Sequence, residues 1–205
     1  MFAAAALAAC TTKMPLRRGA AAIDLEKGSI GFLTLRLDAT HNPDYETEAV
    51  ELDLSEVRDG VTMTRYFPIG DPYLSLNLSS DYFLSFQLPA GDYVLERLLC
   101  RDSGLFGGFT AIPLDVPIHL PAARLAYFGH FDLDLGRWSS RLQPFPSVLQ
   151  TTGDIMAVQL RAPSPFAFEV QDHFDDDVAL ATKSYGLPAS ADVLNAAVPG
   201  TPAGP

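Results

Sequence analysis

The sequence contains few charged residues and little positive charge. Charged residues make up 19% of the 205, and 14 Lys and Arg stand against 25 Asp and Glu, so the formal net charge is −11. A chain that is 48% hydrophobic is too apolar to remain disordered. The shortage of positive charge argues against a nucleic-acid partner, because phosphate binding needs a positive surface. The chain also lacks a run of 18 apolar residues, so the sequence predicts no membrane-spanning helix.

Cysteine and the common enzyme signatures are also scarce. The two cysteines are Cys10 and Cys100, and Cys100 lies in an apolar stretch where a buried small side chain is expected rather than a reactive thiol. The sequence has no G-x-S-x-G, no H-E-x-x-H, no phosphate loop and no calcium loop. We therefore expect neither a catalytic activity nor a cofactor.

The first ten residues are the most informative part of the chain. Residues 1–9 are uncharged and small or apolar, which is typical of the end of a secretory signal peptide. The run Leu7-Ala8-Ala9-Cys10 resembles the lipobox of bacterial lipoproteins. That resemblance implies that Cys10 becomes the first mature residue and carries acyl chains such as palmitate, and that Thr11 is compatible with sorting to the periplasmic face of the outer membrane. No Lys or Arg precedes the apolar stretch, which we attribute to a start assigned too late; the alternative is an alanine-rich helix with a chance cysteine.

Residues 10–28 are predicted to form the lipidated cysteine and a tether, because large apolar side chains do not recur there in any period. Apolar and polar residues then alternate, which predicts strands. These strands are expected at 33–37, 50–54, 61–67, 82–88, 93–99, 112–120, 125–135, 155–160 and 166–170. Their spacing, without helical crossovers, predicts an all-β domain over 29–171: an antiparallel β-sandwich of the prealbumin or immunoglobulin type.

Three local features of these strands give sharper predictions. The turn residues 89–92 separate two alternating runs and predict a β-hairpin. Pro113 and Pro117 fall on outward positions and predict an edge strand. In the run 125–135, Leu125, Tyr127, Gly129, Phe131, Leu133 and Leu135 are expected to share the inward face.

The C-terminal part changes period and predicts a helical appendage over 172–198. Its apolar residues fall on one helical face, with Asp172 as the N-cap and Gly186 as the stop. Residues of that face are Phe174, Val178, Ala181 and Tyr185. A second short helix is expected over 190–197, and the tail 199–205 is expected to be disordered.

Two passages resemble a known family. Residues 86–95 read Phe-Gln-Leu-Pro-Ala-Gly-Asp-Tyr-Val-Leu, and residues 120–129 read Leu-Pro-Ala-Ala-Arg-Leu-Ala-Tyr-Phe-Gly. Together they resemble uncharacterised bacterial lipoproteins with a transthyretin-like (carboxypeptidase-regulatory-like) β-sandwich. The resemblance implies that fold and brings no catalytic residues. A type VI secretion lipoprotein is also a lipidated sandwich, but its pattern is not found around residues 41–53.

The best chemical constellation is His130, Asp132 and Asp134. Alternate residues of a strand point to one face, so the three side chains form a row, and imidazole and carboxylates are metal ligands. The alternative function is therefore a hydrolase or metal-binding protein whose site is assembled from distant residues, with Asp172 as a further member. The simpler interpretation is a solvated polar face with no metal.

Two loops offer candidate partner contacts. The first contains Arg137, Trp138, Arg141 and Phe145, and the second contains Phe106 and Phe109. Trp and Arg are enriched at interface centres, although Trp138 could instead close one end of the core. We expect a non-catalytic binding or structural module that contacts another envelope protein, with the membrane reached through the N-terminal lipid.

Overall fold

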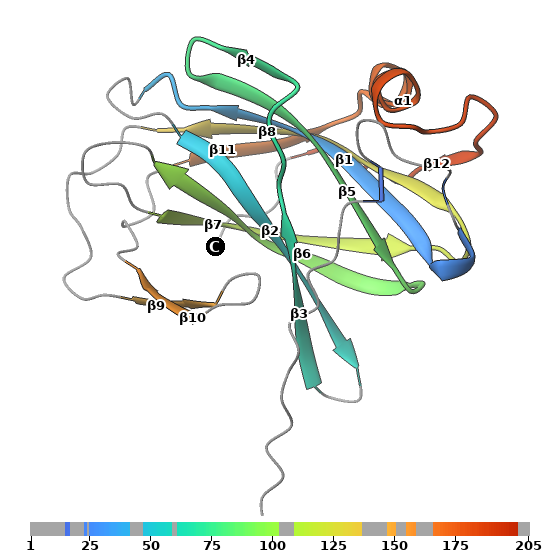
Figure 1. Cartoon of the computed structure of the whole chain (residues 1–205), viewed down its shortest axis with the longest axis horizontal. Coiled ribbons are helices and arrows are strands. Elements are labelled where there is room, and N and C mark those ends of the chain that lie inside the picture. The colour runs from blue at the N-terminus through green and yellow to red at the C-terminus, as the bar shows by residue number, and fades with distance from the viewer. Residues whose placement is uncertain are drawn as a thin grey trace, which may run out of the picture.

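Two β-sheets lie face to face, which confirms the predicted all-β sandwich with a short helix (Figure 1). The structure is a computed structural model that describes residues 15–16, 23, 25–41, 47–58, 61–102, 109–136, 147–150, 155–158 and 166–200. Within these residues no helix is long and apolar enough to cross a membrane.

The first sheet has the strand order β11-β8-β1-β5-β4, and β12 also pairs with β8. Its strands are β1 (Ser29–Asp38), β4 (Leu74–Leu76), β5 (Ser79–Leu88), β8 (Leu125–Leu135), β11 (Phe166–Gln171) and β12 (Val193–Asn195). The second sheet has the order β3-β2-β6-β7. Its strands are β2 (Thr47–Arg58), β3 (Val61–Pro68), β6 (Gly91–Asp102) and β7 (Phe109–Leu120). The remaining elements are η1 (Leu25–Lys27), β9 (Ser147–Gln150), β10 (Ile155–Val158) and α1 (Phe174–Ser184).

The pairing within the first sheet is mixed rather than purely antiparallel. β1 pairs with β5 antiparallel and with β8 parallel, and β12 also pairs with β8 in parallel. The predicted late strand at 155–160 is present as β10, but it pairs with β9 in a separate two-stranded sheet. The second sheet is antiparallel throughout.

The predicted hairpin at residues 89–92 is wrong. β5 pairs with β1 and β4, whereas β6 pairs with β2 and β7, so this turn carries the chain from one sheet to the other. Alternation indicates only that one face of each strand is buried. Two successive strands satisfy this both when they pair in one sheet and when they lie in opposite sheets across the core, so the pattern does not distinguish a hairpin from a crossing. The Tyr93 hydroxyl donates to the Pro89 carbonyl oxygen at 2.9 Å, which closes the corner.

A β-bulge in β8 corrects a second prediction. Phe32 of β1 pairs with Tyr127, but Thr34 pairs with His130, so β8 contains one extra residue between them. Gly129 lies in this bulge with φ +118°, a conformation that side chains disfavour. The extra residue turns Tyr127 and Leu125 to the outer face, whereas Phe131, Leu133 and Leu135 face the core between the sheets as predicted.

The predicted edge strand is confirmed as β7. It lies at one edge of the second sheet, and Pro113 and Pro117 both belong to it. Asp115 has φ +50°, and the register with β6 shifts between Leu95 and Arg97. The two prolines and this irregularity make the outer edge of β7 a poor template for another strand.

Helix α1 covers part of the outer face of the first sheet, and its apolar face is the one predicted (Figure 1). That face packs with Phe32, Phe83 and Tyr127 into a second hydrophobic cluster outside the sandwich core. The N-cap residue is His173, one position after the predicted Asp172, and its side chain makes no capping hydrogen bond. The Asp172 Oδ1 accepts the backbone N–H of Phe174 at 3.1 Å, which is a contact of the capping kind. Gly186, with φ +80°, follows the C-cap residue Tyr185 as expected.

The second helix predicted over 190–197 is absent, and β12 occupies that place. The backbone of β12 pairs with the first residues of β8, on the side of β8 that β11 occupies further along. Pairing with a sheet edge satisfies backbone groups that a three-residue segment could not satisfy alone. Gly200 then exchanges two backbone hydrogen bonds with Val170, each 2.9 Å long, so part of the expected tail is attached to the sheet.

The segment assigned to the tether contains an attachment point. Leu16 is buried in the second cluster. Its N–H donates to the Ser85 hydroxyl at 3.1 Å, and that hydroxyl donates to the Leu16 carbonyl oxygen at 3.0 Å. Cys10 and the residues of the predicted signal peptide lie outside the described residues.

Candidate functional site

The structure places His130, Asp132 and Asp134 in one row on the outer face of the first sheet. They lie opposite Thr34, Arg36 and Asp38 of β1, so the predicted row exists. The members of the row contact different partners rather than one another. The His130 Nδ1 lies 2.8 Å from the Thr34 Oγ1, and the Asp134 Oδ2 lies 3.9 Å from the His41 Nε2. Within the described ranges, no three or more His, Cys, Asp or Glu side chains are grouped so that they could hold a metal ion.

His130 belongs instead to a buried polar network that joins β1, β8 and α1. The hydroxyls of Thr34 and Tyr127 both donate to the Asp177 Oδ2 at 2.6 Å, and Asp177 is 5% exposed. Since the Thr34 hydroxyl hydrogen is used on Asp177, its oxygen accepts from the His130 Nδ1–H. This assignment leaves the lone pair of the neutral ring on Nε2.

Burial and the surrounding charges set the protonation of this network. Burial lowers the pKa of His130, the nearby His173 acts in the same direction, and the carboxylates of Asp177, Asp132 and Asp81 oppose it. The rings of His130 and His173 stack with their centroids 4.5 Å apart. Burial and the Asp177 carboxylate both raise the pKa of Tyr127 above its ordinary value. The network therefore holds a neutral imidazole and a protonated phenol around one carboxylate, an arrangement that attaches α1 to the sheet.

An apolar cavity opens at one end of the sandwich. We call it the mouth cavity. Its volume is about 650 Å³. It is lined by Ser55, Glu56, Val57, Asp92, Tyr93, Val94, Pro117, Ile118, His119, Phe128, Leu194, Ala196 and Val198. The second sheet supplies one wall, Phe128 of β8 belongs to the other, and residues of β12 and the segment after it complete the lining.

Polar groups lie around the mouth cavity. Asp92 and His119 are direct partners in the β6–β7 register, and their Oδ1 and Nδ1 atoms lie 2.7 Å apart. Both side chains are exposed, so this pair carries polar chemistry at the surface beside the apolar lining. On the β2 side, Arg65 donates to the Glu56 Oε1 at 3.2 Å.

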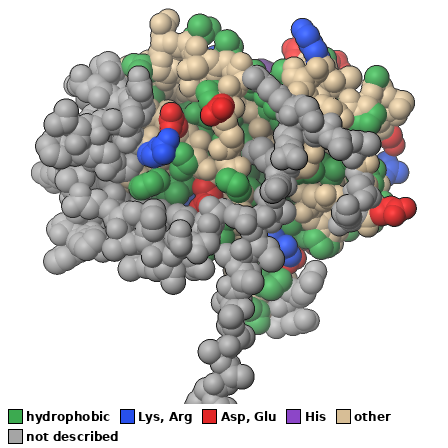
Figure 2. Space-filling view, viewed as in Figure 1, with side chains coloured by type: hydrophobic (Ala, Val, Ile, Leu, Met, Phe, Trp, Pro, Cys, Tyr) green, Lys and Arg blue, Asp and Glu red, His purple; other side chains and the backbone are tan. Residues whose placement is uncertain are grey.

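Exposed aliphatic side chains surround the mouth cavity. Val57 is 72% exposed, Leu194 40% and Val198 75%, and all three line the cavity. Val61 and Met63 are also exposed, and they belong to the β2–β3 hairpin that carries Val57. Hydrophobic side chains are visible on the part of this hairpin that projects from the body (Figure 2). Large hydrophobic side chains at a surface are typical of binding sites when they gather around a cavity.

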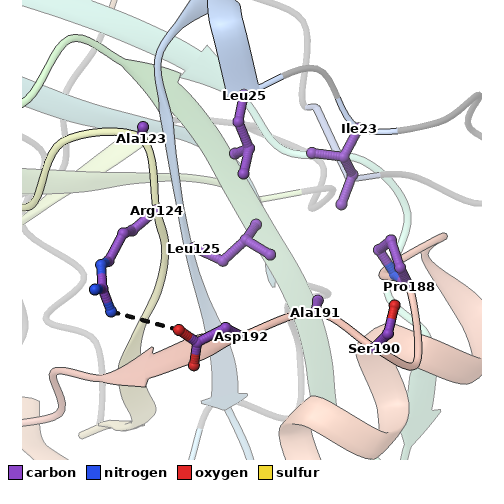
Figure 3. A pocket seen from close by; sticks show the side chains of 9 residues that line it. All are labelled: Ile23, Leu25, Ala123, Arg124, Leu125, Pro188, Ser190, Ala191 and Asp192. Atoms are coloured by element: carbon purple, nitrogen blue, oxygen red, sulfur yellow. Dashed lines mark hydrogen bonds and ion pairs between the residues drawn. The ribbon is translucent and has the colours of Figure 1, made fainter.

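A second hollow of about 450 Å³ lies beside the first residue of β8, where the segment before β1 meets the segment that joins α1 to β12 (Figure 3). Its lining combines Ile23 and Leu25 with Leu125 and with residues between α1 and β12. Arg124 and Asp192 form an ion pair at its side, with Nη1 and Oδ2 3.5 Å apart. This hollow is smaller than the mouth cavity and lacks the surrounding exposed aliphatic side chains, so the mouth cavity is the better candidate site.

The outer face of the second sheet contains buried acids that the sequence pattern places in solvent. Glu51 and Asp53 alternate with apolar residues of β2, yet both are buried. The Arg97 guanidinium donates to the Asp53 carboxylate. Burial nevertheless raises the pKa of Asp53 to about 7, against the opposing charge of Arg97. Asp53 is thus a buried group that changes charge near neutral pH.

The mouth cavity was not predicted from the sequence. Arg137, Trp138, Arg141, Phe145 and Phe106 lie outside the described residues. Phe109, expected in a loop, is the half-buried first residue of β7. One sequence signal could have identified the polar pair beside the mouth cavity. The runs 93–99 and 112–118 pair as neighbouring strands, and this brings Asp92 and His119, which lie just beyond them, together.

Comparisons with protein families, with curated proteins and with solved structures gave no match. The functional argument therefore starts from the residues of this chain and from the geometry of the mouth cavity. That geometry offers an apolar hollow, exposed aliphatic side chains around it and an acid–histidine pair beside it.

Proposed function

We propose that this chain is a cell-envelope lipoprotein whose sandwich is a non-catalytic module for binding another envelope protein. The lipobox-like run ending at Cys10 supports a lipid anchor, and Thr11 supports the periplasmic face of the outer membrane. The lipoproteins with a transthyretin-like sandwich that residues 86–95 and 120–129 resemble would be its relatives. The module would hold its partner close to the membrane that the acyl chains enter.

The observation that carries the binding role is the mouth cavity with its exposed aliphatic side chains. Exposed Val57, Leu194 and Val198 lose contact with water when an apolar surface covers them, at about 25 cal/mol per Å² of apolar area. The occupant we propose is an apolar side chain of a partner protein flanked by basic residues. The basic flanks follow from the exposed Asp92 carboxylate beside the cavity and from the net charge of −11.

Replacing Val198 by Asp should release the partner while the domain stays folded. Val198 is 75% exposed, so the new carboxylate costs the folded state little, but it would have to be buried in the complex. We expect at least a tenfold loss of the partner protein recovered from detergent-solubilised envelopes, which corresponds to about 1.4 kcal/mol. The matched control is Leu76→Asp on β4, where a 62% exposed leucine lies away from the mouth cavity. Equal recovery with both variants would contradict the proposal.

Lipidation of Cys10 has its own test. Metabolic labelling with a fatty-acid probe should tag the wild-type protein, and Cys10→Ser should take no label and leave the membrane fraction. Three acyl chains would anchor the protein firmly, since each buried CH₂ contributes about 0.8 kcal/mol. A Cys10→Ser variant that still takes label and still sediments with membranes would show that the lipobox interpretation is wrong.

A further inference from the structure

Strand β3 forms the second edge of the sheet that β7 also borders. In the part of the chain that the structure describes, β3 pairs with β2 on one side, and no strand pairs with its other side. β3 is eight residues long, and in Figure 1 it projects downward from the body together with the end of β2. An edge of this length presents backbone groups that another strand can bind.

The ladder with β2 shows which backbone groups of β3 face outward. The Ile69 N–H donates to the Val50 carbonyl oxygen at 2.9 Å, one step beyond the Glu51–Pro68 pair. Hydrogen-bonded and non-hydrogen-bonded pairs alternate in an antiparallel ladder. Residues 61, 63, 65 and 67 therefore direct their N–H and C=O groups toward β2. Thr62, Thr64 and Tyr66 direct theirs toward the open edge.

The two edges of this sheet differ in how they are protected. β7 carries two prolines and an irregular register, whereas β3 contains one proline, Pro68, at its last residue. The single charged side chain of β3 is Arg65, which forms an ion pair with Glu56. Thr, Val, Met, Tyr and Phe complete the strand, and these residues favour β-structure or tolerate it. β3 thus lacks the devices that prevent strand addition.

We propose that β3 binds an added β-strand supplied by the partner protein, and that this strand carries basic residues. The inference rests on the proposed binding role and names its mode, in which main-chain hydrogen bonds to Thr62, Thr64 and Tyr66 give the affinity. Side chains on one face of the added strand would cover Val61 and Met63, which are exposed in the free protein. Val57, which lines the mouth cavity, pairs with Thr62 and therefore lies on the opposite face of the hairpin from Val61 and Met63.

Charge favours a basic strand from another protein over a second copy of this chain. The whole chain has a net charge of −11, whereas Glu48, Asp53 and Glu56 of the neighbouring β2 are already paired with arginines. Two copies paired through β3 would bring two molecules of net charge −11 together, and like charges oppose association. A strand that carries lysines would instead be attracted by the negative charge of the chain.

The test uses two synthetic eight-residue peptides, one alternating valine with lysine and one alternating valine with glutamate. We expect the lysine peptide to slow hydrogen exchange of the Thr62, Thr64 and Tyr66 amides at least tenfold, and the glutamate peptide to leave them unchanged. Thr64→Pro removes one outward N–H and leaves the bonds to β2, so it should weaken binding of the lysine peptide at least tenfold. The matched control Thr64→Val keeps that N–H and should bind as the wild type does.

A second form of the test leaves the protein unaltered, in case Thr64→Pro does not fold. A lysine peptide that is N-methylated at every residue has no N–H group to donate to the β3 edge and should not bind. Equal binding of the lysine and glutamate peptides, binding that survives N-methylation of every residue, or a dimer in sedimentation that protects the three amides without peptide would overturn the proposal. Partner recovery that depends on Val198 but not on Thr64→Pro would leave the proposed function standing and remove the strand-addition mode alone.

Discussion

Asp177→Ala should lower the free energy of unfolding by about 3 kcal/mol. Asp177 accepts the hydroxyls of Thr34 and Tyr127, and hydrogen bonds to a charged group are each worth about 1.5–3 kcal/mol. The alanine leaves both buried hydroxyls without their acceptor, and it removes the bond that attaches α1 to β1. Loss of α1 contacts should also expose Tyr185, which stacks on Phe83 with ring centroids 4.1 Å apart.

The comparison for this prediction is Asp176→Ala, one residue earlier on the same turn of α1. Asp176 is exposed, so its loss should change stability by no more than about 0.5 kcal/mol. Urea unfolding followed by circular dichroism measures both variants, and the midpoints give the difference if the slopes agree. Equal stability of the two variants would mean that the Asp177 network does not hold α1 on the sheet.

Acidification from pH 8 to pH 5 should stabilise the protein through Asp53. Burial raises the pKa of Asp53 to about 7, whereas the unfolded chain has an aspartate of ordinary pKa near 4. Between these values the folded state holds a proton that the unfolded state lacks, so stability falls as pH rises through the window and is level above it. The contribution between pH 5 and pH 8 is about 2 kcal/mol in favour of pH 5.

Asp53→Asn isolates this effect, because asparagine does not titrate. The stability gain between pH 8 and pH 5 should be larger in the wild type than in the variant. His130 acts in the opposite direction, since burial lowers its pKa and the unfolded state gains a proton below about pH 6.5. His130 is present in both proteins, so the difference between the two pH profiles removes its contribution. Parallel profiles would show that Asp53 does not titrate near neutrality.

Local side-chain patterns predicted the elements of this fold well. The alternation of Leu33, Leu35 and Leu37 with polar residues identified β1, and those three leucines are buried in the sandwich core. The spacing of Phe174 and Val178 identified the packed face of α1. In both cases the periodicity of apolar residues shows which face of the element packs on a core, and this depends only on residues that are close in sequence.

Features that depend on distant partners could not be predicted in this way. The bulge at Gly129 changes the face of Tyr127, because the extra residue is defined only against the register of β1. Asp53 is at an alternating polar position, and its burial depends on what covers the outer face of the second sheet. The mouth cavity likewise needs β2, β6, β7 and Phe128 in one place before it exists.

The parallel pairing of β1 with β8 has a consequence for the speed of folding. Thr34 and His130 are partners in this pairing although they are 96 residues apart, so β1 cannot complete its ladder until most of the domain has been made. The entropy cost of closing a loop of that length comes before the contacts between the two strands stabilise the chain, so such topologies fold in milliseconds to seconds or slower. During that interval β1 and β5 expose apolar strands that can pair with other chains.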